Sequence, residues 1–401
     1  MGIAGGPNLN QDGLVFLYDV FDQDNSYKGE PTVNYVPGTY NYSLYAYVSG
    51  PVDTVILNEK NQSITAKRYT ITNAVNTARA RILPSGLATG VAYTFSFKWK
   101  YNGTTTASPS VGIDASKGNP EGGANNNSFT SQTTNTVFIG NGWYLSTYIF
   151  VFSSVPTGNC MLTFGIVTNT TAGYVGETFD IYEAQFEIKN HRTQYSNGTR
   201  SATQGLLDVV GTTQIDLTNV SFDSNAQIVF DGTNDYINIG SGTGINQLSG
   251  DFAISLWAMR TAGGNYGNLI GDYYTNNTGT TGEWQIMMGP SSQLNLYKVG
   301  SGYIISNTAS GFSNNTWINV VVTRLGNLVT MYANSNVIAT GTDSTSYGTV
   351  TGNLNIGIDG NNSSEPFPGN IASISIYKNR ALSAQEVLQN YNATKSRFGL
   401  K

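Results

Sequence analysis

The stretch Phe252-Ala253-Ile254-Ser255-Leu256-Trp257 decides the fold class of this 401-residue chain. Phe252, Ile254 and Leu256 recur with a period of two, which places them on one face of an extended strand. Three other runs in the last third follow the same alternation, and Gly, Asn or Ser bounds each of them: residues 230–236, 317–324 and 371–377. These runs predict half-buried antiparallel strands and an all-β domain.

A second series of strands is predicted between residues 35 and 195. Tyr93, Phe95, Phe97 and Trp99 alternate with polar residues, so their rings share one face of a strand and point into a core. Similar apolar runs follow at residues 144–152, 161–167 and 179–188. The chain therefore predicts two antiparallel β-sandwiches, which its length can accommodate as separate domains.

Two shorter segments complete the expected fold. Residues 14–18, Leu-Val-Phe-Leu-Tyr, form one apolar strand that needs a partner to cover its edge. Near the C-terminus, Ser383 and Glu386 have the spacing of a capping box, and Leu382 and Val387 have that of a hydrophobic staple. These four residues predict a single short C-terminal helix that covers one face of a sandwich.

Composition excludes several classes of function. Only 11% of the residues are charged, the net charge is −5 and no run of Lys or Arg occurs, so neither nucleic acid nor an anionic membrane surface is an expected partner. No apolar run approaches 18 residues, and no membrane insertion is predicted. Cys160 is the only cysteine, which excludes an intrachain disulfide. The N-terminus lacks the basic and apolar regions of a signal peptide, which predicts synthesis in a cytoplasm.

The common catalytic motifs are missing, so the chain is predicted not to be an enzyme. His191 is the only histidine, and its polar surroundings predict a surface position. No nucleophile elbow, phosphate-binding loop or His/Cys zinc cluster occurs. Glu177 and Asp180 are the nearest pair of carboxylates for glycoside hydrolysis, but their spacing of three places them on opposite sides of a strand.

Three parts of the chain resemble known families. The strands of the last third, closed by Arg380-Ala381-Leu382-Ser383, resemble the laminin-G/concanavalin A-like lectin superfamily. Residues 35–199, with the turn Asn141-Gly142-Trp143-Tyr144 and the closing strand Ala184-Gln185-Phe186-Glu187, resemble the jelly-roll carbohydrate-binding modules of bacteriophage tail and fibre proteins. The opening Gly5-Gly6-Pro7-Asn8 resembles the start of lectin-like structural proteins of tailed phages.

These resemblances imply a discontinuous domain. Residues 1–34 are expected to supply an N-terminal arm and the first strand of the lectin-like sandwich, and residues 200–401 to complete that sandwich. Residues 35–199 are the expected inserted jelly roll. The predicted fold class is all-β: two antiparallel β-sandwiches (jelly rolls) with one short C-terminal helix.

Candidate glycan-binding residues lie in loops, because sugars stack on aromatic faces while amides bind their hydroxyls. Tyr273, Tyr274 and Asn276 lie together in a Gly/Asn-rich segment, and Trp143 occupies a second turn. These four residues are the predicted glycan site. Trp257, in contrast, is expected to be a framework residue in a core or under the helix.

A calcium site is a further implication of the resemblance. Laminin-G-like domains often bind calcium through loop carboxylates and backbone carbonyls at the rim of the sandwich, which implies Asp272 and Asp359 as ligands. Both residues end a predicted strand and enter a loop. Solvated turn residues are the alternative interpretation of these two acids.

The resemblance implies a virion structural protein of a tailed bacteriophage, made in the host cytoplasm and displayed on the virion surface as a fibre or capsid decoration subunit. Its expected partners are capsid or tail proteins, host-surface carbohydrate and copies of itself, since trimers are common among phage fibres. The glycine-rich arm of residues 1–10 is the expected anchor. The alternative is a free bacterial carbohydrate-binding or adhesion protein without catalytic activity.

Overall fold

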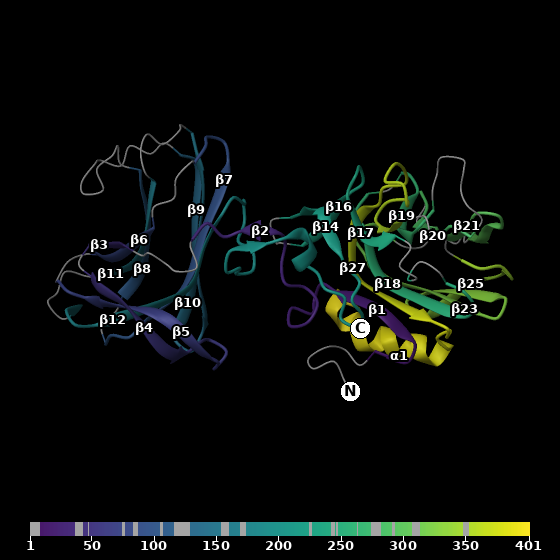
Figure 1. Cartoon of the computed structure of the whole chain (residues 1–401), viewed down its shortest axis with the longest axis horizontal. Helices are drawn as coiled ribbons and strands as arrows, with labels where there is room; N and C mark the ends of the chain where they lie inside the picture. Colours follow the sequence, from purple (N-terminus) through teal and green to yellow (C-terminus); the bar gives the residue numbers. More distant parts are fainter. Residues whose placement is uncertain are drawn as a thin grey trace. The chain divides into compact units, whose positions relative to one another are not determined.

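The structure is a computed structural model of the chain, coloured along the sequence in Figure 1. Contacts divide the chain into two compact units: Met1–Pro31 with Ser201–Lys401, here called the discontinuous unit, and Thr32–Arg200, the inserted unit. The residues that the structure describes are 9–36, 43–46, 48–73, 77–82, 87–104, 107–115, 129–153, 160–168, 174–223, 227–241, 245, 248–262, 264–273, 282–290, 293–306, 313–347 and 353–401.

The discontinuous unit is a sandwich of two antiparallel sheets. The eight-stranded sheet has the order β15-β16-β27-β18-β23-β24-β25, with β1 also paired to β27. The seven-stranded sheet has the order β14-β17-β26-β19-β20-β21-β22. The first sheet comprises β1 (Leu14–Asp19), β15 (Ser221–Phe222), β16 (Ile228–Asp231), β18 (Phe252–Arg260), β23 (Trp317–Leu325), β24 (Leu328–Ala333), β25 (Asn336–Thr342) and β27 (Pro368–Lys378). The second comprises β14 (Asp216–Asn219), β17 (Tyr236–Ser241), β19 (Gly267–Gly271), β20 (Trp284–Met288), β21 (Leu294–Lys298), β22 (Gly302–Ser306) and β26 (Asn353–Ile356).

Alternate residues of the two sheets meet in one apolar core. Phe252, Ile254 and Leu256 of β18 enter this core, and Ile286 of β20 and Leu296 of β21 enter it from the other sheet. The period of two in the sequence therefore corresponds to the pleat of real strands. The predicted all-β class with a short C-terminal helix is confirmed.

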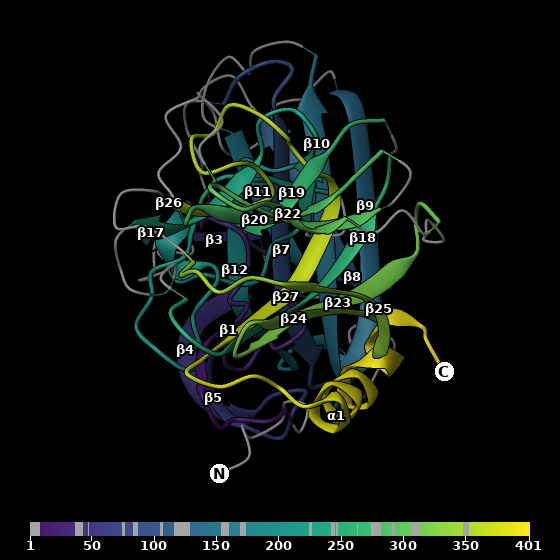
Figure 2. The same cartoon turned by 90° about the vertical axis from the view of Figure 1, so that its right-hand side faces the viewer.

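β27 holds the first strand of the chain in place. β1 pairs antiparallel with it, from Leu14 opposite Tyr377 to Asp19 opposite Ser373. Figure 2 shows β27 crossing this unit next to β18, which pairs with its other edge. Phe16 of β1 is fully buried in the core, so an apolar strand from the start of the chain finds its partner near the end.

A short helix covers the outer face of the eight-stranded sheet. α1 (Ala384–Thr394) begins at Ser383, whose side chain forms the capping box with Glu386, and a 3₁₀ turn, Lys395–Phe398, follows it. Trp257 stacks on Phe398 at 4.0 Å between ring centroids, and its indole N–H donates to Thr394 Oγ1 at 3.1 Å. Trp257 is thus a framework residue covered by the helix, as predicted.

In the described part of the chain, no helix is long and apolar enough to span a membrane.

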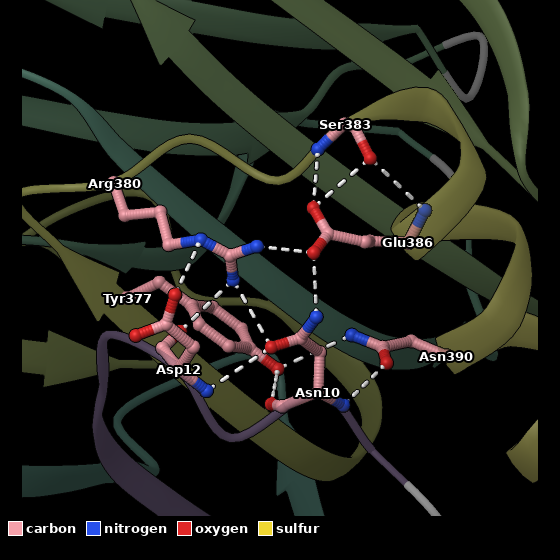
Figure 3. Close-up of polar contacts among 7 residues, drawn as sticks. All are labelled: Asn10, Asp12, Tyr377, Arg380, Ser383, Glu386 and Asn390. Carbon is pink, nitrogen blue, oxygen red and sulfur yellow. Dashed lines mark hydrogen bonds and ion pairs between the residues drawn. The ribbon is translucent and has the colours of Figure 1, made fainter.

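Asn10 ties the start of the chain to this helix (Figure 3). Its backbone N–H donates to Asn390 Oδ1 at 2.9 Å, and its side-chain amide donates to Glu386 Oε1 at 2.6 Å. Its two oxygens accept from Arg380 Nη1 at 3.0 Å and from the Tyr377 hydroxyl at 2.9 Å. All four polar groups of Asn10 are therefore used inside this unit. Residues 1–8 of the expected arm lie outside the described residues, and the anchor role of residues 1–10 stays a prediction.

The inserted unit is a second sandwich with an aromatic core. Its sheets have the orders β4-β5-β12-β7-β10-β9 and β3-β6-β11-β8, and β2 pairs with β13 in a short ribbon. Phe95 and Phe97 of β7 each pack against Phe164 of β11 in the opposite sheet, at 5.4 and 5.3 Å between ring centroids. The strands are β2 (Thr32–Val33), β3 (Ser43–Ala46), β4 (Val48–Leu57), β5 (Ser63–Ile71), β6 (Thr77–Ile82), β7 (Ala92–Tyr101), β8 (Ala107–Ala115), β9 (Phe129–Gly140), β10 (Trp143–Phe152), β11 (Cys160–Thr168), β12 (Thr178–Glu187) and β13 (Thr199–Arg200).

The division into domains at residues 34 and 199 stays a prediction that fragments can test. A fragment of residues 201–401 lacks Phe16 and Tyr18, whose side chains are fully buried. Burial of one such side chain is worth about 1.5–3 kcal/mol, so we expect this fragment to melt at a lower temperature or to aggregate, and an added peptide of residues 9–31 to restore it. Circular dichroism melts measure both effects, with a fragment of residues 32–200 as the comparison. An unchanged melting temperature for residues 201–401 contradicts the discontinuous domain.

Candidate functional site

The outer face of the seven-stranded sheet carries a layer of polar side chains. Gln285 of β20 lies opposite Tyr297 of β21, and Tyr297 lies opposite Tyr303 of β22. Their neighbours along the strands, such as Ile286 and Leu296, point into the core instead. The strand pleat therefore brings polar and aromatic groups from three strands to one side of this sheet.

Several amides in this layer are buried and only partly hydrogen-bonded. Asn268, Gln285, Asn295 and Asn355 are each at most 2% exposed. The atoms without a hydrogen-bond partner are Asn268 Oδ1, Gln285 Oε1 and Nε2, Asn295 Nδ2 and Asn355 Oδ1. A buried polar atom that stays without a partner costs about 1–3 kcal/mol, so each of these atoms calls for one. This layer can offer both donors and acceptors to a polar ligand.

The segment between β26 and β27 brings Glu365 to the same face. Asn268 donates its backbone N–H to Glu365 O at 2.8 Å, and Asn355 Nδ2 donates to Asp359 O at 2.7 Å and to Asn362 Oδ1 at 2.6 Å. Glu365 has a φ of 55°, a left-handed conformation that is costly for a residue with a side chain. The strand amides therefore hold this segment in a strained shape that orients Glu365.

Burial is the main influence on the Glu365 carboxyl group. It raises the pKa of Glu365, the Gln285 amide lowers this pKa, and the nearby carboxylate of Asp359 raises it further, so that the net shift is upward. Glu365 Oε2 is buried without a hydrogen-bond partner. A carboxyl group in this environment keeps its proton to higher pH than an exposed glutamate does.

Tyrosines form a row beside this carboxyl group. Tyr273 packs edge-to-face on Tyr297 at 5.1 Å, and Tyr297 packs in the same way on Tyr303 at 5.3 Å. Burial raises the pKa of Tyr273 to about 12, and the charge of Glu365 contributes to the rise at both Tyr273 and Tyr303. Tyr303 remains 51% exposed. We call the surface formed by Tyr273, Gln285, Tyr297, Tyr303 and Glu365 the tyrosine face.

A polar hollow of about 580 Å³ adjoins the tyrosine face at Tyr303. Ser301, Asn327 and residues 342–345 contribute to its lining. At its base Lys298, which is fully buried, forms an ion pair with Asp343 and donates to Thr345. The hollow extends the tyrosine face toward β25, which gives room for a ligand larger than one ring.

The structure brings only one of the four predicted glycan-site residues to this face. Tyr273 is that residue, while Tyr274 and Asn276 lie outside the described residues. Trp143 lies in the inserted unit and is fully buried, so the prediction of an exposed ring in a turn is wrong. Its indole N–H donates to Leu57 O at 2.9 Å, because the end of β4 covers the ring.

The acids considered for catalysis in the inserted unit hold its strands together. Asp180 receives two hydrogen bonds from Arg68, each at 2.7 Å, and a third at 2.7 Å from Asn102. Glu177 accepts from the backbone N–H of Thr104 at 2.9 Å.

The expected surface position of His191 is wrong, because its side chain is buried at 6% exposure.

Asp272 and Asp359 lie in adjoining loops. The backbone N–H of Gly360 donates to Tyr273 O at 2.6 Å, and a Cβ at position 360 would lie 2.7 Å from the carbonyl of Asp272. Asp272 Oδ1 accepts from the backbone N–H of Trp284 at 2.9 Å.

The carboxylate of Asp359 is also used within its own loop. Oδ1 accepts from the backbone N–H groups of Ser363 and Ser364, and Oδ2 accepts from the Ser364 hydroxyl at 3.0 Å. Among the residues that the structure describes, no group of three or more His, Cys, Asp or Glu side chains could hold a metal. The calcium role of Asp272 and Asp359 stays a prediction, and their visible role is to shape the loops beside the tyrosine face.

Sequence reasoning did not identify Gln285, Asn295, Tyr297 or Glu365. The alternation of polar and apolar residues in β20 and β21 was a usable signal, since it places Gln285 and Tyr297 on the face opposite the core. Glu365 offered no such signal. It reaches the face through a strained segment whose shape depends on hydrogen bonds to strands far away in the sequence.

Comparison with known proteins agrees with the fold of the discontinuous unit. Residues 231–388 match the family model of the concanavalin A-like lectin/glucanases superfamily. The matched region contains most strands of both sheets, so this unit has a laminin-G/concanavalin A-like lectin fold. No curated protein sequence matches the chain.

Solved structures with similar chain traces are distant. Domain 4 of the arabinanase AbnA from Geobacillus stearothermophilus is 16% identical, with a TM-score of 0.34, over 45% of this chain and 82% of that one. The CBM40 domain of the Ruminococcus gnavus IT-sialidase is 15% identical, with a TM-score of 0.32, over 38% and 94%. The receptor-binding domain of botulinum neurotoxin D is 16% identical, with a TM-score of 0.38, over 49% and 51%. Scores of this size carry no argument about function.

The upward pKa shift of Glu365 predicts a pH-dependent stability. The folded state favours the protonated acid, so this contribution to stability is complete below the pKa of an unfolded glutamate and is lost as the pH rises through the raised folded value. Glu365→Gln cannot ionise. We therefore expect it to melt a few degrees higher than the wild type at pH 7, since 1 kcal/mol corresponds to about 2–4 °C in a domain of this size, and equally at pH 3–4. Melting curves across this pH range measure the difference, and a pH-independent difference contradicts the assignment.

Proposed function

We propose that the tyrosine face binds carbohydrate and that the protein is a glycan-binding structural subunit of a tailed-bacteriophage particle. The observation that carries the first part is the arrangement of Tyr273, Tyr297 and Tyr303 beside the incompletely hydrogen-bonded amide of Gln285 and the carboxyl of Glu365. Aromatic rings stack on the C–H faces of sugars, while amides and carboxyls bind hydroxyl groups.

The chemistry of the site favours binding over hydrolysis. Glycoside hydrolysis uses two carboxyl groups that flank the scissile bond. Asp359 is the acid whose charge acts on Glu365, but both of its oxygens accept hydrogen bonds from Ser363 and Ser364. It is therefore engaged in its own loop rather than placed to attack a sugar. We propose a non-catalytic lectin-like site.

The site also favours neutral glycans. Glu365 lies on the tyrosine face and the charge of Glu283 also acts on Tyr273, so both acids, when ionised, would repel the carboxylate of an acidic sugar. The net charge of −5 acts in the same direction. A shallow site of this kind gives millimolar to micromolar affinity, so useful attachment requires many copies, as on a particle surface built from a homo-oligomer.

Tyr303→Ala tests the glycan site against a matched control. Tyr303 is 51% exposed on the tyrosine face, and Tyr35 of the inserted unit is 50% exposed. Because one aromatic contact is worth roughly 0.5–1.5 kcal/mol, we expect Tyr303→Ala to weaken binding to an immobilised panel of neutral glycans roughly three- to tenfold, and Tyr35→Ala to leave it unchanged. Equal binding by both variants and the wild type would remove the tyrosine face as the site.

The particle role is a separate prediction. It is supported by the resemblance of residues 35–199 to jelly rolls of phage tail and fibre proteins and by that of the opening segment to lectin-like structural proteins of tailed phages. We expect mass spectrometry of density-purified particles to detect this chain in a fixed ratio to the capsid or tail proteins. Recovery of the chain only in the particle-free lysate would favour a free bacterial adhesion protein.

A further inference from the structure

A break in strand pairing leaves a pocket at the edge of β27. β16 pairs with the start of this strand, at Pro368 and Gly369, and β1 pairs with its second half, from Ser373 onward. Both strands lie along the same edge of β27, because β18 pairs with its other edge from Gly369 to Lys378. Residues 370–372 therefore face a gap between two strands that come from distant parts of the chain.

The gap contains a cavity of about 200 Å³, here called the ring pocket. Ile371 and Ala372 of β27 are part of its lining. Phe21, which is 41% exposed, and the partly exposed Trp317 also line it. Both of these rings contact Phe398, at 5.3 Å and 4.8 Å between centroids, so they form one aromatic row beside the pocket.

Uncharged amides supply the polar part of the lining. Gln23 and Gln227 are exposed side chains at the pocket. Asn370 is fixed in place because its Nδ2 donates to Ile228 O at 2.6 Å. Among the described residues that line the pocket, none is charged. The pocket thus combines aromatic surface with hydrogen-bonding amides and offers no partner for an ionic group.

We infer that the ring pocket binds a single neutral saccharide ring. An ionic ligand would lose its hydration without gaining a countercharge, and a wholly apolar ring would desolvate the three amides without replacing their hydrogen bonds. A volume of about 200 Å³ is below the ~300 Å³ at which pockets for drug-sized ligands begin, so it fits one ring rather than an oligosaccharide. The pocket lies on the eight-stranded sheet, so this inference does not depend on the tyrosine face.

Trp317 gives a direct readout of this pocket. It is the only partly exposed tryptophan among the five in the chain, because Trp99, Trp143, Trp257 and Trp284 are each at most 2% exposed. Quenching of tryptophan fluorescence by acrylamide therefore reports mainly on Trp317. The variant Trp317→Phe keeps an aromatic ring and should remove the accessible fraction, which verifies the assignment.

The experiment titrates glucose, galactose, mannose and N-acetylglucosamine against the full-length protein. We expect at least one of them to shield Trp317 saturably with a dissociation constant of roughly 1 mM, as a ligand of this size allows. Phe21→Ala should weaken the shielding roughly three- to tenfold. Gln23→Ala removes one of the amides at an exposed position and does not disturb the packing of Phe21 on Phe398. We expect this variant to weaken the shielding of Trp317 as well.

Tyr303→Ala and cyclohexanol separate this inference from its alternatives. Shielding that persists in Tyr303→Ala belongs to the ring pocket, even if that variant no longer binds the glycan panel. Loss of shielding in Tyr303→Ala would overturn the inference, because the signal would then come from the tyrosine face. The inference would also be overturned if cyclohexanol shielded Trp317 and none of the sugars did. It would be overturned as well if no sugar shielded Trp317 up to about 100 mM, which is about a hundredfold above the expected dissociation constant.

Discussion

The pairing of β1 with β27 is the constraint on which the discontinuous unit depends. The chain forms β1, leaves for Thr32–Arg200 and returns, and this pairing joins its first strand to β27, while Val209 donates its backbone N–H to Leu17 O at 2.9 Å. Loop-closure entropy grows slowly with length, by about 0.6 kcal/mol for each doubling, so a long insertion costs little once Phe16 and Tyr18 are buried. The same pairing positions Asn10 under α1 and defines one side of the ring pocket.

The tyrosine face contains features that cost stability. Its buried amides and the left-handed backbone of Glu365 each cost free energy, in a sandwich whose core is otherwise continuous and apolar. Local features that conflict with an otherwise consistent fold are typical of functional surfaces. This contrast separates the tyrosine face from the acids of the inserted unit, where Asp180 is fully paired with Arg68 and Asn102.

The strands and the helix could be predicted because their signals are local. β18 and β7 alternate with a period of two, and Ser383 and Glu386 are three residues apart. Tyr273 could be singled out from the sequence because a tyrosine in a Gly/Asn-rich loop has few places to be buried, and its role in binding stays a prediction. The prediction for Trp143 is wrong because its turn has the composition of an exposed loop. In the structure, Asn141 Nδ2 donates to Asn58 O and Asn61 Oδ1, and these bonds hold the β4–β5 turn against the turn that carries Trp143. Contacts of this kind between distant segments leave no local pattern.

The two proposed sites differ in the size of ligand that they can hold and in whether binding depends on pH. The tyrosine face has a titratable carboxyl group and an adjoining hollow, so its ligand can be extended and its binding can depend on pH. The described lining of the ring pocket has no charged residue and leaves room for one ring, so binding there should not depend on pH. Either site alone is weak, because few contacts offset the entropy lost on binding. Two weak sites on opposite sheets cannot share one short ligand, and they gain strength only when a glycan layer meets many copies of the chain at once.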